Sequence, residues 1–367
     1  MIPQANPQAS YFSRSEKIND AVSRVLNSGW YIAGQEVKSF EQEFGAWLGL
    51  GDVIGVGNGT DALELSLAAL GIQEGDEVIT TPHTASATAC AIVCSKATPV
   101  LVDIYPDTFT LNLDQVEAKI TSKTRAIIPV HLYGMPVDMG RLMAIANKHN
   151  IPVIEDCAQA HGACCNGQMV GTFGAIASFS FYPTKNLGAF GDGGAIATSN
   201  AKLGTHAREL AQYGWRQRYI SDEVGMNSRL DEMQAAILRV KLPDLDAENA
   251  RRRAIAAQYT QALADVVRVP YEPEGFESAY HLYVIRTEQR DALRTYLQQK
   301  GVGTAIQYPV PIHLQPAYKG WLGDVGSFPE TELAAQEIVS LPLYPEMTDE
   351  QVNTVIHYVR EFFTTAA

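Results

Sequence analysis

The stretch DVIGVGNGTDALELSLAAL (52–70) joins a short apolar run to an amphipathic run through a glycine-rich turn. Its spacing predicts a buried strand over 52–56 and a helix over 61–70. Similar apolar runs recur downstream, with helical patterns such as 139–149 between them; they lie at 77–82, 98–104, 124–131, 151–157 and 175–182. Strands that are apolar on both faces and alternate with helices predict an α/β domain, a mostly parallel sheet flanked by helices.

The pattern changes after residue 230. One helix is predicted over 231–241 and, after Pro243, a long charged helix over 246–265. Shorter elements follow; they are strand-like pieces at 281–287 and 307–318 and helices that begin at Thr331 and Asp349. We therefore predict a large domain over 1–245 and a smaller C-terminal α+β domain over 246–367.

Composition limits the kinds of partner. The chain has 367 residues, 46% of them hydrophobic and 19% charged, which is typical of a globular protein. Its net charge of −13 disfavours nucleic acid and anionic membranes as partners, although a local pocket for a small anion is compatible with it. The N-terminus MIPQANPQAS lacks the features of a secretory signal, and the five cysteines form no C-x-x-C pair. We expect free thiols, a cytoplasmic location and no membrane segment.

The glycine-rich turn at 55–60 is a candidate anion site. Gly57 and Gly59 allow a tight turn, and the free amides at a helix start favour a phosphate group. A dinucleotide-binding loop fits poorly, because the third glycine of its fingerprint would fall on Thr60 and no acidic residue ends the following strand. An ordinary strand–turn–helix connection remains the alternative.

Asp156 ends the predicted strand of VIEDCAQAHGA (153–163), where a carboxylate is partly desolvated and needs a positive or donating partner. The alternative for a lone aspartate is a helix cap. His161 lies close in sequence to three cysteines, Cys157, Cys164 and Cys165. Their spacing fits no usual zinc pattern, and we expect no metal.

Lys185 lies in ASFSFYPTKNLGAFGDGGAI (177–196), between an apolar strand and four glycines. Most lysines are solvated surface charges, but few surface lysines have such flanks. Burial lowers a lysine pKa and makes the amine nucleophilic. Lys185, Asp156 and the anion site together match the needs of pyridoxal 5'-phosphate: an amine for its aldehyde, a carboxylate for its ring nitrogen and amides for its phosphate.

The sequence resembles the DegT/DnrJ/EryC1/StrS family of sugar aminotransferases, a branch of the fold type I pyridoxal-phosphate enzymes. Motifs in the family's order cover nearly the whole chain; they are GWYIAGQEVKSFEQEF (29–44), GNGTDAL (57–63), PVHLYG (129–134), EDCAQAHGA (155–163), SFYPTKNLGAFGDGGA (180–195), NSRLDEMQAAIL (227–238) and HLQPAY (313–318). The resemblance implies the fold type I architecture and an enzyme that transfers amino groups.

The resemblance also implies roles for individual residues. Lys185 would bind the cofactor covalently and later carry the proton, and Asp156 would hold the pyridinium nitrogen. The remaining cofactor contacts would be Gln159 near the 3-oxygen, Gly59, Thr60 and Ser180 at the phosphate, and Asn227 reaching that phosphate from the partner subunit of a homodimer.

Other assignments from the resemblance concern the ring and the substrates. Many family members have an aromatic residue where Ala85 stands, so His83 is the candidate for stacking on the cofactor ring. Arg229 would bind the donor's carboxylate, where a planar guanidinium suits. The candidates for contact with the sugar are Tyr31, Tyr308 and His313.

The implied reaction moves an amino group from L-glutamate to a keto group of a nucleotide-linked deoxysugar. The segment YPVPIHLQPAY (308–318) resembles the version in enzymes that act at C3 of dTDP-linked 3-keto-6-deoxyhexoses, a step of deoxyamino sugar biosynthesis. Alternatives are amination at C4 of a UDP- or dTDP-4-keto sugar and sugar dehydration. A non-catalytic cofactor-binding regulator is a further alternative. Because family members that dehydrate have histidine in place of the lysine, Lys185 favours transamination.

Overall fold

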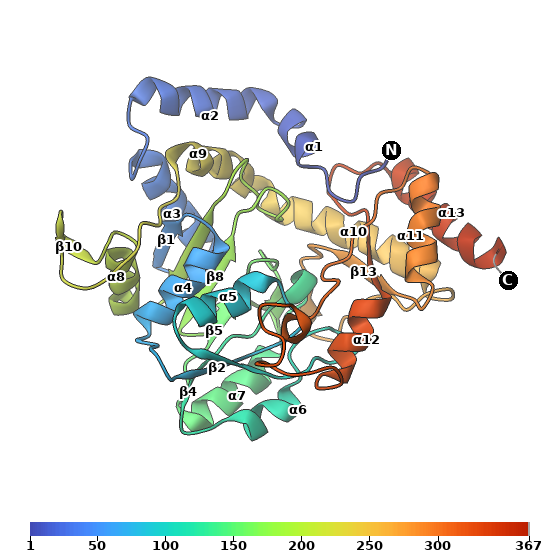
Figure 1. Cartoon of the computed structure of the whole chain (residues 1–367). Helices are drawn as coiled ribbons and strands as arrows, with labels where there is room; N and C mark the ends of the chain where they lie inside the picture. The colour runs from blue at the N-terminus through green and yellow to red at the C-terminus, as the bar shows by residue number, and fades with distance from the viewer. Residues whose placement is uncertain (366–367) are drawn as a thin grey trace.

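The computed structural model describes residues 1–365 and is built around a central sheet (Figure 1). One set of strands has the order β1 (Asp52–Val56), β9 (Gly194–Thr198), β8 (Ile176–Ser180) and β5 (Ile154–Asp156). The other has the order β3 (Thr98–Leu101), β2 (Glu77–Thr80) and β4 (Thr124–Ile127). Parallel bridges from Ile127 to Val153 and from Val130 to Asp156 join the two sets. The sheet is parallel except at β9, which runs antiparallel to β1 and β8.

Helices cover both faces of this sheet. On one face, apolar side chains of α3 (Gln35–Leu48) and α9 (Glu232–Lys241) pack with Phe179 of β8, and α7 (Met139–His149) packs with Ile127 of β4. On the other face, α4 (Gly59–Ala69), α5 (Ser86–Cys94) and α8 (Ala201–Leu210) pack with Ile176. Because side chains alternate along a strand, β8 contributes to both cores, as a strand buried on both sides must.

The C-terminal part has its own apolar core. Here β13 (Tyr283–Arg286) pairs antiparallel with β14 (Ile338–Leu341). Four helices surround this pair; they are α10 (Leu245–Leu263), α11 (Arg290–Gln299), α12 (Pro329–Glu337) and α13 (Asp349–Thr365). The N-terminus lies beside this part (Figure 1), because Ile2 bridges to Val302. The chain then leads through α1 (Pro7–Phe12) and α2 (Ser15–Ser28) back to the large sheet.

Short elements complete the chain. A hairpin of β10 (Trp215–Gln217) and β11 (Ile220–Ser221) projects beyond α8 (Figure 1). A three-stranded sheet has the order β12 (Phe276–Glu277), β6 (Cys164–Cys165) and β7 (Gln168–Met169). The other short elements are helical; they are α6 (Leu113–Val116) and 3-10 turns at Glu117–Lys119, Leu132–Gly134, Leu242–Asp244 and Ile312–Leu314.

The predicted α/β class is confirmed, and the predicted strands of the large sheet all occur. Two local expectations differ. The strand β9 was not predicted, because it begins at a glycine within the glycine-rich run after Lys185. The segment 307–318 forms no strand; Pro309 and Pro311 lack the amide hydrogens that a strand would need there. The domain boundary at residue 245 stays a prediction.

Two further points concern the helices and the cysteines. Among residues 1–365, none of the helices combines the length and the apolar character that a bilayer-crossing segment needs. All five cysteines are free thiols, and Sγ of Cys90 and Sγ of Cys94 lie 3.8 Å apart on α5.

Candidate active site

The carboxyl ends of β5 and β8 and the start of α4 surround one cavity of about 380 Å³. Such a position, beyond the carboxyl ends of parallel strands, is where α/β sheets bind ligands. Predicted site residues line its wall; they are Gly59, Thr60, Asp156, Gln159, Ser180 and Lys185. The tertiary structure therefore brings together residues that are up to 126 positions apart, from Gly59 to Lys185.

One end of the cavity is suited to a phosphate. The side chain of Asn58 caps α4 by accepting a hydrogen bond of 2.9 Å from the Asp61 amide. The amides of Gly59 and Thr60 precede the first intrahelical hydrogen bonds and carry the positive end of the helix dipole. A Cβ on Gly59 would lie 2.8 Å from Cβ of Ser180, so only glycine lets the two segments approach this closely.

Asp156 supplies a buried carboxylate at the end of β5. It is 5% exposed and accepts hydrogen bonds from Thr88 Oγ1 at 2.9 Å and from the Ala158 amide at 3.2 Å. Burial raises the pKa of this carboxyl, and the two hydrogen bonds and the Lys185 charge oppose that shift. A protonated ring nitrogen bound against Asp156 would satisfy this carboxylate further.

Gln159 is held in place on the same wall. Its Oε1 accepts a hydrogen bond of 2.7 Å from the Tyr133 amide, and its Nε2 donates one of 3.1 Å to the Tyr308 hydroxyl. The side-chain amide is thus fixed between two parts of the chain, as contact with a ring oxygen requires.

Lys185 follows β8, in a turn closed by its amide and the Tyr182 carbonyl at 2.8 Å. Burial lowers the pKa of its amine to about 8, and the charge of Asp156 acts in the opposite direction. The same lysine lines a second cavity of about 350 Å³. Its amine therefore stands at the junction of two cavities, with a larger neutral fraction near pH 7 than an ordinary lysine has.

The structure does not bring His83 to the cavity. Its ring is 1% exposed, packs against Phe109 and Tyr133, and exchanges a hydrogen bond of 2.8 Å with the Tyr133 hydroxyl. Burial lowers the pKa of His83 to about 3, so it is a neutral core histidine. Thr84 and Ala85, which follow His83 in the sequence, line the cavity instead.

The side chain of His313 lines neither the cofactor cavity nor the second cavity. It is fully buried, packs edge-on against Phe328 and has its Nε2 at 3.1 Å from Glu332 Oε1. Tyr308, by contrast, lines the second cavity beside Lys185. Of these two candidates for sugar contact, the structure brings only Tyr308 to the site.

Three other candidates lie away from both cavities of their own chain. Asn227 is exposed just after the projecting hairpin, where it bridges to Gln212. Arg229 is half-buried beside Gly55, and Tyr31 is 52% exposed in the turn before α3. At these positions the side chains are accessible to a second subunit.

Sequence reasoning missed several residues of the site. Thr88 binds Asp156 from α5, and Tyr182 lines both cavities. Asn186 donates hydrogen bonds of 2.8 Å to Asn249 Oδ1 and to the Ala279 carbonyl, which anchors the turn after Lys185 to the C-terminal part. The repeated threonines of TTPHTASAT (80–88) were the one sequence signal for Thr88, because Thr84 and Thr88 are spaced by one helical turn.

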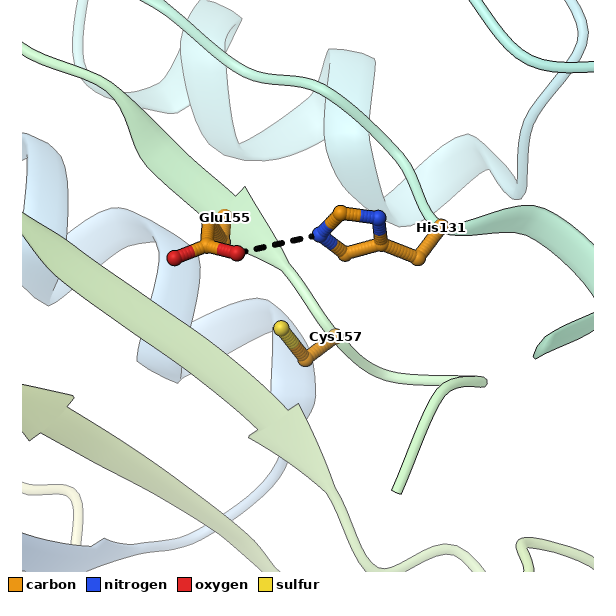
Figure 2. A group of neighbouring side chains, drawn as sticks. All are labelled: His131, Glu155 and Cys157. Atoms are coloured by element: carbon orange, nitrogen blue, oxygen red, sulfur yellow. Dashed lines mark hydrogen bonds and ion pairs between the residues drawn. The ribbon is translucent and has the colours of Figure 1, made fainter. Parts of the chain in front are cut away.

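His131, Glu155 and Cys157 form a buried cluster at the end of β5 (Figure 2). Each residue has one atom that could bind a metal, and these three atoms lie within 4.8 Å of one another. The Glu155 carboxylate already accepts hydrogen bonds of 2.7–2.8 Å from the amides at 171, 173 and 174, besides facing His131 Nε2 at 3.2 Å. His131 Nδ1 accepts from the Val137 amide at 3.0 Å. Because these lone pairs are occupied, the cluster is a hydrogen-bonded anchor of the loops, not a vacant ligand set.

The lysine, the carboxylate and the helix start fit the aldehyde, the ring nitrogen and the phosphate of pyridoxal phosphate around one cavity. On this sheet, that combination defines the fold type I pyridoxal-phosphate enzymes. The chain belongs to the DegT/DnrJ/EryC1/StrS aminotransferase family, whose sequence model matches residues 13–360.

Three relatives are similar to this chain over nearly its whole length. A dTDP-3-amino-3,4,6-trideoxy-alpha-D-glucose transaminase of Streptomyces venezuelae is 45% identical over 363 residues, 98% of this chain and 96% of that one. A dTDP-3-amino-3,6-dideoxy-alpha-D-galactopyranose transaminase of Aneurinibacillus thermoaerophilus is 46% identical over 365 residues, 99% of each chain. A Geobacillus stearothermophilus relative named pleiotropic regulatory protein is 44% identical over 366 residues, 99% of this chain and 98% of that one.

Two solved structures share this fold. S. venezuelae DesV in complex with a ketimine intermediate has a TM-score of 0.97, 45% identity and 98% coverage of both chains. Bacillus subtilis NtdA with bound cofactor PMP has a TM-score of 0.88 and 32% identity, covering 96% of this chain and 82% of that one. These matches confirm the predicted class, a pyridoxal-phosphate-dependent aminotransferase of this family.

Proposed function

We propose that this enzyme transfers the amino group of L-glutamate to C3 of a dTDP-linked 3-keto-6-deoxyhexose. The observation that carries the proposal is the position of Lys185, whose amine stands at the junction of two cavities and opposite Asp156. The choice of C3 is supported by the names of the Streptomyces and Aneurinibacillus relatives, which are transaminases of dTDP-3-amino sugars.

The chain's own residues would act as follows. Bound pyridoxal phosphate supplies an electron sink that stabilises negative charge next to the amino group. Asp156 keeps the ring nitrogen protonated, Gln159 orients the ring edge, and the amides of Gly59 and Thr60 with Ser180 hold the phosphate. Lys185, once its amine is free, takes the α-proton of the donor and later returns a proton to the sugar carbon. With a pKa of about 8, its amine can do both near neutral pH.

The first experiment is the visible spectrum of the purified holoenzyme before and after L-glutamate. We expect the yellow absorbance to bleach and 2-oxoglutarate to appear in equal amount, and the bleached enzyme to recover its colour with a dTDP-3-keto sugar. Recovery with a 4-keto sugar alone would reassign the carbon, and dehydration without amination would reassign the reaction. A protein that stays unchanged with every donor and sugar would fit the regulatory relative instead.

We also propose a homodimer with shared active sites, in which Asn227 reaches the partner's cofactor phosphate. Exposed apolar side chains near α2 and the hairpin support it, among them Trp30 at 64%, Tyr31 at 52% and Tyr219 at 73% exposure. Apolar exposure of this kind marks interaction surfaces. We place the dimer in the reducing cytoplasm, where its five cysteines would stay free thiols.

Mixed dimers test this shared site. Lys185→Ala and Asn227→Ala variants, each inactive or nearly so, should regain activity when they are mixed and refolded together. One of the two sites in each mixed dimer then carries neither change. Because about half of the dimers are mixed, about a quarter of the wild-type activity should return. Absence of any recovery, with mixed dimers present by mass spectrometry, would mean that Asn227 serves its own subunit.

A further inference from the structure

A second cavity, of about 350 Å³, meets the cofactor cavity at Gln159, Tyr182 and Lys185. Its wall includes the N-terminal segment from Gln4 to Ser10, the first half of α10 and the segment 343–346. These parts lie together in Figure 1, where the N-terminus runs beside the C-terminal part of the molecule. The roles proposed for the cofactor site leave this cavity without an assigned ligand.

Arg252 of α10 lies on this wall, and part of its guanidinium group lacks hydrogen-bond partners. The residue is only 6% exposed, yet its Nε and Nη1 have no hydrogen-bond partner among the residues described. Nε2 of Gln4, on the same wall, is also buried without a partner. Buried polar groups are nearly always paired, so unpaired donors on residues beside a cavity indicate a missing acceptor.

The charges around the cavity favour an anion. Lys241 is a second buried cation on the wall, and its Nζ donates one hydrogen bond of 2.6 Å to the Gly188 carbonyl. Two carboxylates also line the wall. Glu248 forms an ion pair with Arg14, burial raises the pKa of Glu346, and burial lowers the pKa of Lys241 to about 8. Lys185, Lys241 and Arg252 are thus three basic residues on a wall that carries two acidic ones.

The cavity is large enough for a small anion. Binding sites for small molecules start at about 300 Å³, so this cavity has room for a five-carbon dicarboxylate. A transaminase must bring two substrates of very different size to the same lysine. Two cavities that meet at Lys185 offer each substrate a separate approach to it.

We propose that Arg252, assisted by Lys241, binds a carboxylate of the amino donor and of its 2-oxo acid product in this second cavity. The inference rests on the proposed transaminase function and adds to it the residue that selects an acidic donor. Arginine suits this role, because its planar group binds a carboxylate through two hydrogen bonds.

The test measures binding of glutarate, a dicarboxylate without an amino group, to the holoenzyme by calorimetry. Arg252→Gln should weaken glutarate binding about tenfold to a hundredfold, because a charge-assisted hydrogen-bonded pair is lost. Arg252→Lys should recover part of the affinity. Arg251→Gln is the matched control on the same helix; Arg251 pairs with Asp349 and the Met347 carbonyl, so glutarate binding should not change.

A kinetic readout separates this inference from the proposed function. In Arg252→Gln, the rate of the donor half-reaction should no longer saturate as the L-glutamate concentration increases. The rate at which the keto sugar restores the colour should stay the same. Equal glutarate affinity in wild type and Arg252→Gln would overturn the inference even if glutamate reacts. Wild type that binds glutarate through Arg252 but never reacts with glutamate would overturn the proposed donor alone. If Arg252→Gln does not fold, Lys241→Met and Arg252→Lys decide the question by the same titration.

Discussion

The hydroxyl group of Thr88 donates a hydrogen bond of 2.9 Å to Oδ2 of Asp156, and both residues are buried. Thr88 belongs to α5 and Asp156 ends β5, so the bond connects a surface helix to the centre of the cofactor site. It stabilises the charged form of a carboxylate whose pKa burial raises.

Replacing Thr88 by valine keeps the shape and removes this donor. We expect the pKa of Asp156 to increase further and the apoenzyme to bind pyridoxal phosphate about tenfold more weakly, since a hydrogen bond to a charged group contributes roughly 1.5–3 kcal/mol. Titration of the apoenzyme followed by absorbance measures this affinity. Thr110→Val, which removes another buried hydroxyl that bonds to Thr108 and not to Asp156, is the control; equal affinities in the two variants would contradict the assigned role.

Gly59 offers a test of the phosphate end. In Gly59→Ala the new methyl group would meet Cβ of Ser180 at 2.8 Å and separate the segments that form the cradle. We expect cofactor affinity to decrease about tenfold or more while the fold persists, since overpacking costs about 1–3 kcal/mol.

Gly51→Ala is the matched control for that change, because no atom lies within 4 Å of its added Cβ. Competition between inorganic phosphate and pyridoxal phosphate for the apoenzyme should weaken in Gly59→Ala alone. An unchanged phosphate affinity in Gly59→Ala would place the phosphate elsewhere.

The pKa of Lys185 predicts a pH dependence. Only the neutral amine attacks the cofactor aldehyde, and burial lowers this pKa from 10.5 to about 8. The rate at which apoenzyme binds the aldehyde should therefore increase as pH rises toward about 8 and level off above it. In Asp156→Asn the plateau should begin at a lower pH, because the negative charge that raises the lysine pKa is lost. A rate that keeps increasing to pH 10.5 in the wild type would mean that the amine is solvated.

Glu155 anchors the loops behind the site rather than acting in it. Glu155→Gln puts an amide group opposite the backbone amides at 171, 173 and 174, so at least one donor loses its acceptor. We expect the free energy of unfolding to decrease by about 3 kcal/mol, measured by chemical denaturation. Glu117→Gln is the control, because Glu117 forms its ion pairs in solvent, and its denaturation midpoint should stay near that of the wild type.

Part of the site was predictable because the sequence periodicity locates the strand ends. Asp156 and Ser180 close the apolar runs of β5 and β8, which pair in parallel register, and Lys185 follows β8 by a short turn. Parallel strands present their carboxyl ends at one edge, so residues at those ends meet whatever their distance along the chain.

Loop side chains were less predictable. His83 and His313 both stand in loops near the site, yet each turns into a separate apolar core, against Tyr133 in one case and Phe328 in the other. Local sequence does not fix these rotamers, because the packing partners lie 50 residues away for His83 and 15 for His313. Thr88 was missed for the same reason, since its partner is 68 positions further along.

The sequence by itself determined the class of fold and the cofactor, and it predicted the lysine that would bind the cofactor, because each depends on local patterns of apolar runs, glycines and strand-end polar residues. Only the tertiary structure decided which side chains reach the cavities and that two cavities meet at Lys185. Arg252 illustrates the difference. Along α10 it is one of three consecutive arginines, and packing of the chain buries this one while its neighbours pair with acidic residues. Burial is a property of the packed chain, and burial makes its unpaired charge informative.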